Sequence, residues 1–290
     1  MALIATAVLL RETRAVTAGR LDLGGVALLS TALLFVLYPL IQGPQRGWPS
    51  WTFVLLAAAP VMLVLFVGQQ RAREQRARAP LVPLRLFGHR GFTGGLVTQL
   101  SLYSAVVGFF LVLAIFLQAG LGFSALHAGL TFLPFSLGIA LASGAAGPLA
   151  LRFGRRLTTT GSLIMAAGMA LLLAAISLAG SDTSTWTLLP GLVLAGVGMG
   201  LIAPTLIDVA LTRVEPADAG AASGVVTTAG QLGGAIGVAL IGVVFFGALP
   251  DTTASNPTLG YLHAFRAALS YEIGVLILTA VLMLLLPRKE

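Results

Sequence analysis

Two carboxylic acids lie inside long apolar runs of this sequence, where an ionised group is costly. Glu272 comes seven residues after Phe265, with which the last apolar run begins, and Asp208 lies three residues before the end of the run Leu188–Leu211. An ionised side chain near the centre of a lipid bilayer costs about 2.5–3.5 kcal/mol. Burial at such a site favours the protonated acid. Both acids are therefore candidates for taking up and releasing a proton.

Each acid also has a purely structural interpretation. Glu272 can be a neutral, hydrogen-bonded helix residue, and Asp208 can be an interfacial acid near Arg213. At 1.5 Å per residue, seven residues place Glu272 roughly 10 Å from the outer end of its helix. Arg266 is six residues from Glu272 and off its helical face. We expect Arg266 to extend to the outer lipid headgroups instead of pairing with the acid.

A loop rich in arginine and glycine, GPLALRFGRRLTTTG, contains a second group of candidate residues. Gly147 and Gly154 permit tight backbone geometry between two helices. Arg152, Arg155 and Arg156 can bind carboxylates or the negative carbonyl ends of helices. Such a contact could hold two helix bundles together in one conformation and release them in another, which makes this a candidate gating loop. The alternative is that the arginines are only cytoplasmic positive charges.

Polar and aromatic side chains at helical spacing mark two of the apolar runs as candidate cavity walls. Gln99, Tyr103 and Phe110 are predicted to share one helical face, and Thr227, Thr228 and Gln231 form a narrow polar stripe. An aromatic and amide lining suits large amphipathic compounds, which are often cationic. Helix packing and interhelical hydrogen bonds are the alternative explanation for both sets.

The elements that position these residues are predicted to be membrane-spanning helices. Hydrophobic residues make up 57% of the 290 residues and charged residues only 9%, whereas a water-soluble domain carries roughly 25% charged residues. A span needs about 20 apolar residues, and continuous runs rich in Leu, Ala and Gly indicate helices instead of barrel strands. The fold class is therefore all-α, a polytopic transmembrane bundle. Its eight expected spans are Leu23–Ile41, Trp51–Gly68, Phe92–Leu117, Ala128–Leu151, Leu157–Ala179, Leu188–Leu211, Ala221–Leu249 and Phe265–Leu286.

The basic residues predict the orientation of the chain. If the segment before Leu23 is cytoplasmic, the outer side receives only Arg46 and Arg266, with Trp48, Trp51, Trp186 and Tyr261 as interfacial anchors. The C-terminus is then cytoplasmic, and the protein lies in the cell membrane. The predicted cytoplasmic side receives Arg11, Arg14, Arg20, Arg71, Arg73, Arg76, Arg78, Arg85, Arg90, Arg152, Arg155, Arg156, Arg213, Arg288 and Lys289.

The chain divides into four expected segments. Residues 1–20 are read as the remnant of a preceding helix and a cytoplasmic segment, 21–70 as a two-helix hairpin, 71–90 as a basic cytoplasmic linker, and 91–290 as a six-helix unit. Six helices form one half of a transporter that is built from two parallel halves. Within the unit, the pairs Gly220/Gly224, Gly230/Gly234, Gly233/Gly237 and Gly196/Gly200 predict close helix contacts.

Several other classes of function find no support in the sequence. The chain has no Cys, which excludes disulfides and thiolate metal sites. Its three His residues lack metal-ligand spacing, and no nucleophile–base arrangement or phosphate-binding motif is present. We therefore predict no metal, no cofactor and no enzymatic activity. The net charge of +7 lies in short gaps between apolar runs and does not indicate nucleic-acid binding.

Four stretches of the chain, in order, resemble the fourteen-helix drug:proton antiporters of the major facilitator superfamily. LDLGGVALL resembles the entry to their central hairpin, and SALHAGLTFLPFSLG resembles one of their later helices. DAGAASGVVTTAGQLGGAIGVAL resembles their penultimate helix, with Thr227 where Asn is expected. The loop at Gly147–Arg156 is similar to the family pattern G-x-L-A-D-R-x-G-R-K, although Leu151 replaces its acid.

The resemblance implies a function and also an incomplete set of helices. It implies proton-coupled efflux of hydrophobic or cationic small molecules across the lipid bilayer. The chain resembles the last eight of the fourteen helices, so we expect a C-terminal transporter part that works with an N-terminal half, which could be encoded separately. The alternative is a non-transporting membrane interaction subunit or an inactive transporter fragment.

Overall fold

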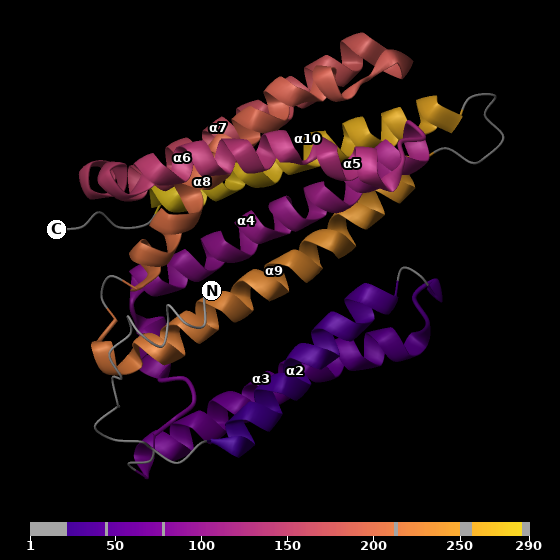
Figure 1. Cartoon of the computed structure of the whole chain (residues 1–290). Helices are drawn as coiled ribbons and strands as arrows, with labels where there is room; N and C mark the ends of the chain where they lie inside the picture. Colours follow the sequence, from indigo (N-terminus) through magenta and orange to yellow (C-terminus); the bar gives the residue numbers. More distant parts are fainter. Residues whose placement is uncertain (1–21, 44–45, 77–78, 212–213, 250–256, 286–290) are drawn as a thin grey trace, which may run out of the picture.

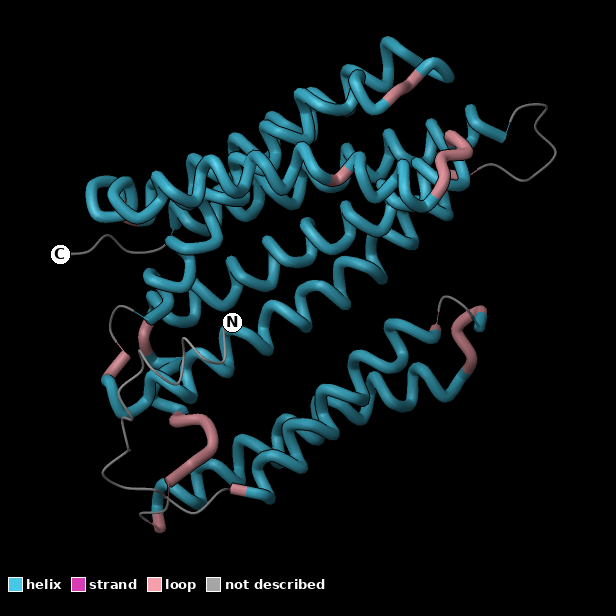
Figure 2. The backbone as a smooth tube through the Cα atoms, viewed as in Figure 1, coloured by secondary structure: helices cyan, strands magenta, loops and turns pink. Residues whose placement is uncertain are grey.

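The computed structural model describes residues 22–43, 46–76, 79–211, 214–249 and 257–285. Within these residues the chain is helical apart from short loops (Figure 2), and it contains no strand. Eight of its helical segments are long and apolar enough to cross a membrane. The expected all-α bundle of eight spans is therefore confirmed. Long helices are the physical consequence of this composition, because hydrocarbon offers no partners for backbone N–H and C=O groups.

The first two helices form a hairpin that stands apart from the rest. α2 covers Leu23–Gln42 and α3 covers Ser50–Gln75, and they pack mainly against each other. Figure 1 shows the pair in indigo and violet, separated from the other helices along most of its length. α3 continues to Gln75, which lies inside the segment expected as a linker, and a short 3₁₀ helix, η2 (Leu84–Gly88), precedes the next span.

The other six spans pack together as one bundle. α4 (Arg90–Ile115) lies along α9 (Ala219–Gly247), while α8 (Thr185–Leu211) packs between α6 (Leu133–Phe153) and α7 (Arg155–Ala179). α10 (Pro257–Leu285) packs against α7, α4 and α9. Figure 1 shows α9 beside α4 on the side of the bundle that faces the hairpin.

Two details of the helices differ from the sequence-based expectation. The span expected at Ala128–Leu151 begins inside a short helix, α5 (Ala125–Thr131), whose N-terminus is capped by Ser124. The last helix begins at Pro257, eight residues before the expected start at Phe265. Thr258 and His263 lower the hydropathy of the residues before Phe265, so the apolar run does not reveal this first part of the helix.

Glycines set the shortest distances between the helices. A Cβ atom added at Gly237 would lie 2.0 Å from the carbonyl oxygen of Ser104, and one at Gly233 would lie 2.5 Å from that of Leu100. The packing predicted for Gly196 and Gly200 is also confirmed, because both contact α6 closely. For Gly220/Gly224 the prediction of close contact is wrong, because neither residue has an atom of another helix within 4 Å of an added Cβ.

Candidate functional site

Glu272 lies at the meeting point of α4, α9 and α10. It is fifteen residues after Pro257 and thirteen before Leu285, so it sits near the middle of α10 and deeper than the predicted start at Phe265 implied. Its side chain is 0% exposed. A Cβ atom added at Gly108 of α4 would lie 2.9 Å from Glu272 Oε1 and 3.3 Å from the Gly237 carbonyl oxygen of α9. The carboxyl group therefore occupies the space that the missing side chain of Gly108 leaves open.

Both carboxyl oxygens of Glu272 lack a hydrogen-bond partner among the described residues. A buried polar group without a partner is uncommon, and it is costly in its ionised form. The alternative predicted from the sequence is a structural glutamate held by hydrogen bonds. No hydrogen bond to a described residue supports that role in this conformation. An acid in such a place is suited to hold a proton until a change in packing gives the carboxylate a more polar environment.

Arg266, one of the two basic residues predicted to face outward, binds carbonyl groups near the end of α7. Its Nη2 atom donates to the carbonyl oxygens of Ile176 (3.2 Å) and Ser177 (3.3 Å) near the C-terminal end of α7. Whether Arg266 also reaches the outer headgroups stays a prediction. Carbonyl groups near a helix end carry partial negative charge and attract a cation, while Arg266 Nε is buried without a hydrogen-bond partner among the described residues.

The second acid candidate and the candidate gating loop lie at the opposite end of the helices from the α7–α8 turn. Asp208 belongs to the last turn of α8, and its side chain lies outside the described residues, as does that of Arg155. Gly154 ends α6 with φ +51°, a conformation that favours glycine. Gly147, Arg152 and Arg156 are exposed. No acid among the described residues forms an ion pair with Arg152 or Arg156.

The six candidate cavity residues separate into three groups. Gln99 and Tyr103 of α4 pack against Gly230 of α9. A Cβ atom added at Gly230 would lie 3.1 Å from Gln99 Nε2. Phe110 instead contacts Phe132 and Phe135 at the start of α6, with ring centroids 5.3 and 4.9 Å apart. On α9, Thr227 and Gln231 are exposed and Thr228 is half-buried. Both threonine hydroxyls donate within their own helix, to the carbonyl oxygens of Ser223 and Gly224.

Gln99, Tyr103 and the polar stripe of α9 thus lie on neighbouring helices around Gly230. Gln231 follows this glycine directly, and Thr227 precedes it by less than one turn. Thr227 and Gln231, the exposed part of the stripe, flank the side of α9 that packs on α4. Such a surface can contact a polar or cationic group of a ligand, or another helix.

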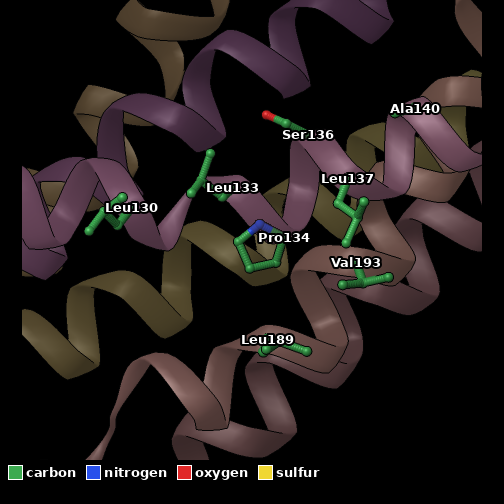
Figure 3. Close-up of a pocket in the computed structure, with 8 residues that line it drawn as sticks. All are labelled: Leu130, Leu133, Pro134, Ser136, Leu137, Ala140, Leu189 and Val193. Atoms are coloured by element: carbon green, nitrogen blue, oxygen red, sulfur yellow. The ribbon is translucent and has the colours of Figure 1, made fainter.

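An apolar groove that sequence analysis missed lies between α6 and α8. Its volume is about 620 Å³, and Ser136 is its one polar lining residue. Figure 3 shows the side chains around it, with Pro134 between the two helices. Such a lining fits an apolar molecule or chain segment. None of the six candidate cavity residues contributes to it; the lining consists of Leu130, Leu133, Pro134, Ser136, Leu137, Ala140, Leu189 and Val193.

A polar cluster around Asp22 joins the hairpin to the linker. Asp22 caps α2 by accepting from the Gly25 backbone N–H at 2.9 Å, and it also accepts from Gln69 (2.8 Å) and Gln70 (2.9 Å) of α3. Arg73 Nε lies 3.3 Å from its carboxylate. Burial raises the pKa of Asp22, but these hydrogen bonds and the charge of Arg73 outweigh burial and hold the pKa below its ordinary value.

The linker is in turn fixed to the six-helix bundle. Gln70 accepts from the Val82 backbone N–H at 3.1 Å, and Glu74 accepts from that of Leu84 at 3.0 Å. From η2, Arg85 Nη2 reaches Asp218 Oδ2 at 2.7 Å and Glu215 Oε2 at 3.4 Å, immediately before α9. A continuous set of polar contacts therefore runs from the start of α2 to the start of α9.

Comparison with known proteins gives this arrangement a family context. The sequence profile of the Major Facilitator Superfamily matches residues 15–238 of the chain. The chain is 38% identical to the probable actinorhodin transporter of Streptomyces coelicolor, over 88% of the chain and 44% of that protein. It is 34% identical to the puromycin resistance protein pur8 of Streptomyces alboniger, over 97% of the chain and 57% of that protein.

A third similar protein is named for resistance to multiple drugs. The multidrug resistance protein Stp of Mycobacterium tuberculosis is 35% identical to the chain, over 78% of the chain and 41% of that protein. The chain spans about half the length of the curated relatives it matches.

Proposed function

We propose that this chain, which belongs to the major facilitator superfamily, is the C-terminal part of a proton-coupled exporter of hydrophobic drugs in the cell membrane. The single observation that carries the proton coupling is the buried, unpartnered carboxyl group of Glu272 between α4, α9 and α10. The carboxyl group binds a proton in this packing and loses it when the helices rearrange. Its position at the middle of α10 suits a site that alternates between the two sides of the membrane.

The proposed substrates are hydrophobic small molecules, often with a cationic group. Three similar proteins are named for actinorhodin transport, puromycin resistance and multidrug resistance. In this chain, Gln99 and Tyr103 lie beside the exposed polar stripe of α9 and supply amide and aromatic groups. These groups suit the polar end of an amphipathic compound, because an aromatic face attracts a cation.

The proposed partner is an N-terminal transporter half, joined to this chain or encoded separately. Alternating access moves one half of such a transporter against the other around a site near the membrane midplane. The six spans from α4 to α10 constitute one half, and the exposed stripe of α9 is a surface that the other half can face. The distribution of arginines supports a cytoplasmic location for the basic linker and the C-terminus.

Energised efflux of ethidium from cells tests this function. Cells that express the chain together with a segment supplying the N-terminal helices should export ethidium, and cells with the chain alone should not. Glu272→Gln should abolish export, because a neutral amide cannot release a proton. The exposed Asp182→Asn variant is the matched control and should export normally.

Three results would count against the proposal. Normal export by the Glu272→Gln protein would remove Glu272 from proton coupling. Energised export by the chain alone would show that no second half is needed. Absence of export in every combination, with the protein present in the membrane, would favour a non-transporting interaction subunit.

A further inference from the structure

Two of the candidate cavity residues and Glu272 lie along one seam, the line of contact between α4 and α9. Near one end of this seam, Gln99 and Tyr103 of α4 contact Gly230 of α9, and the exposed part of the polar stripe of α9 lies beside them. We call this part of the seam the ligand end, because the proposed function assigns these residues to the substrate. The Glu272 carboxyl group lies further along the same seam.

Backbone contacts connect the ligand end to Glu272 turn by turn. A Cβ atom added at Gly233 would lie 2.5 Å from the Leu100 carbonyl oxygen, and one added at Gly237 would lie 2.0 Å from that of Ser104. Gly230, Gly233 and Gly237 are spaced by three and four residues, so they share one face of α9. The seven residues from Gly230 to Gly237 correspond to roughly 10 Å along the helix.

The last of these contacts also encloses the carboxyl group of Glu272. Gly108 follows Ser104 by one helical turn on α4. A Cβ atom added at Gly108 would lie 2.9 Å from Glu272 Oε1 and 3.3 Å from the Gly237 carbonyl oxygen. The same point is 3.2 Å from Ile241 Cγ2 of α9. α9 therefore forms one wall of the space that holds this carboxyl group, which is 0% exposed and has no hydrogen-bond partner among the described residues.

The seam can transmit a displacement because its central contacts involve the backbones of both helices. A side chain that is pushed rotates, whereas the carbonyl oxygens of Leu100 and Ser104 are held in the regular backbone of α4. At Gly233 and Gly237, α9 has no side chain that could yield to pressure or fill a gap. A separation of the helices at the ligand end therefore continues toward Glu272 as the motion of a rigid element, which is one way that coupling passes between two sites.

We propose that a ligand bound at the ligand end separates α9 from α4 and thereby opens the Glu272 carboxyl group to water, so that this seam couples ligand binding to proton release. This inference rests on the proposed function of Glu272 and of the cavity residues. In the opened seam the carboxyl O–H bond breaks, the proton passes to a water molecule, and Glu272 is left as a carboxylate. When the ligand leaves, the helices close again only after a proton is taken up, because burying an unpartnered carboxylate is costly.

Glu272 is the one carboxylic acid in the sequences of α4, α9 and α10, so a change in its proton exchange can be assigned to it. The other ionisable residues of these helices are Arg90 and Tyr103 on α4 and Tyr261, His263, Arg266 and Tyr271 on α10, and α9 has none. The elements packed against them contribute ionisable residues near their own ends, which are Tyr38 of α2, Arg85 of η2, Arg155 and Arg156 of α7, Asp182 of η4 (Gly180–Asp182), Asp208 of α8 and Asp218 of η5 (Pro216–Asp218).

Hydrogen–deuterium exchange of the Glu272 carboxyl group tests the coupling on the full chain in lipid nanodiscs. Transfer into D₂O replaces the carboxyl proton by deuterium and shifts its infrared band, which is identified by the difference from Glu272→Gln. Ethidium is the probe ligand, and its binding to the same samples is measured by fluorescence polarisation. Saturation with ethidium should speed the exchange about tenfold, a factor within the usual range of coupling between two sites.

A pair of glycine variants separates the role of the seam from other effects of a ligand. Gly233→Ala forces α4 and α9 apart without a ligand, because the added Cβ would lie 2.5 Å from a backbone oxygen. Its exchange should be about tenfold faster than that of the wild type before ethidium is added, and ethidium should then change it little. Gly242→Ala, also on α9, has no atom of another described helix within 4 Å of the added Cβ and should behave like the wild type.

The outcomes distinguish this coupling from the proposed function. Ethidium that binds without changing the exchange rate would overturn the coupling and leave Glu272 as a proton site, and so would a wild-type rate in a folded Gly233→Ala protein. If Gly233→Ala does not fold, the wild-type rates with and without ethidium decide alone. A chain that binds no ethidium would overturn the assignment of the ligand end. A Glu272 carboxyl group that is already ionised without a ligand would overturn its proposed role in proton coupling.

Discussion

At the residue scale, the site around Glu272 depends on glycines, which have no side chain, as much as on the acid itself. Gly108 gives space to the Glu272 carboxyl group, and Gly233 and Gly237 bring the backbone of α9 against α4. Close backbone approach is a main source of attraction between helices in a membrane, where the hydrophobic effect does not drive helices together. The position of Glu272 is therefore expected to be sensitive to added methyl groups on these glycines.

Gly237→Ala should destabilise the six-helix bundle. The added Cβ would lie 2.0 Å from the Ser104 carbonyl oxygen, so α4 and α9 must separate. Overpacking of this kind costs about 1–3 kcal/mol. Gly224→Ala, on the same helix with open space around it, is the control and should be neutral or stabilising, since alanine favours helix over glycine. Equal thermal midpoints for the two variants in detergent would contradict this packing.

The charge of Asp22 should make stability depend on pH. Folding lowers the pKa of Asp22, so its contribution is complete above the unfolded pKa, about 3.9, and is lost as pH falls through the folded pKa. Asp22→Asn should lower the thermal midpoint at neutral pH, because hydrogen bonds to a charged group contribute about 1.5–3 kcal/mol. The difference from the wild type should shrink below about pH 4. A difference that is constant with pH would argue against an ionised Asp22.

At the element scale, the sequence predicts the spans well and their contacts poorly. Apolar runs of sufficient length identify all eight helices, because hydrocarbon permits little else. The predicted start of α10 is too late in the sequence because Thr258 and His263 lower the hydropathy of its first turns. Helical spacing groups Phe110 with Gln99 and Tyr103, yet Phe110 packs on α6. Spacing on one helix contains no information about which neighbour each turn meets.

The polar contacts of the linker also could not be predicted from the sequence. Arg85 was predicted only as one of many cytoplasmic charges, and its partner Asp218 is 133 residues away in the sequence. No local pattern could identify that pair. The Gly108–Glu272 contact and the Ser101–Thr279 hydrogen bond are unpredictable for the same reason, because they depend on the rotation of α10 against α4.

Charge reversal tests the connection between the linker and α9. Arg85→Glu and Asp218→Arg should each increase amide hydrogen exchange in η2, and the double variant should recover part of the protection. The recovery should be small, because the Arg85 side chain is 59% exposed and solvent screens the interaction. Arg76→Glu, an exposed linker position without an ion pair among the described residues, should have no effect. Exchange in the double variant as fast as in both single variants would show that Arg85 and Asp218 do not interact.

At the scale of the whole molecule, the six-helix bundle and the hairpin form two parts that are joined at one end. The Asp22 cluster and the Arg85–Asp218 pair lie at the end where α3 and the linker meet α9, while the hairpin has few contacts with the bundle elsewhere. This end also carries the exposed Arg152 and Arg156. Placing all of these charges in one aqueous compartment requires the eight helices to cross the membrane in strict alternation.

The labelling of single cysteines from one side of the membrane tests this topology most directly, and the chain has no native Cys to interfere. Ala79→Cys and Gly88→Cys lie in the linker, whereas Ala125→Cys and Ser181→Cys lie at the opposite ends of the helices, and all four positions are exposed. In intact cells, a membrane-impermeant maleimide should label Ala125→Cys and Ser181→Cys, and should label the linker positions only after permeabilisation. Labelling of Ala79→Cys or Gly88→Cys from outside intact cells would contradict the orientation.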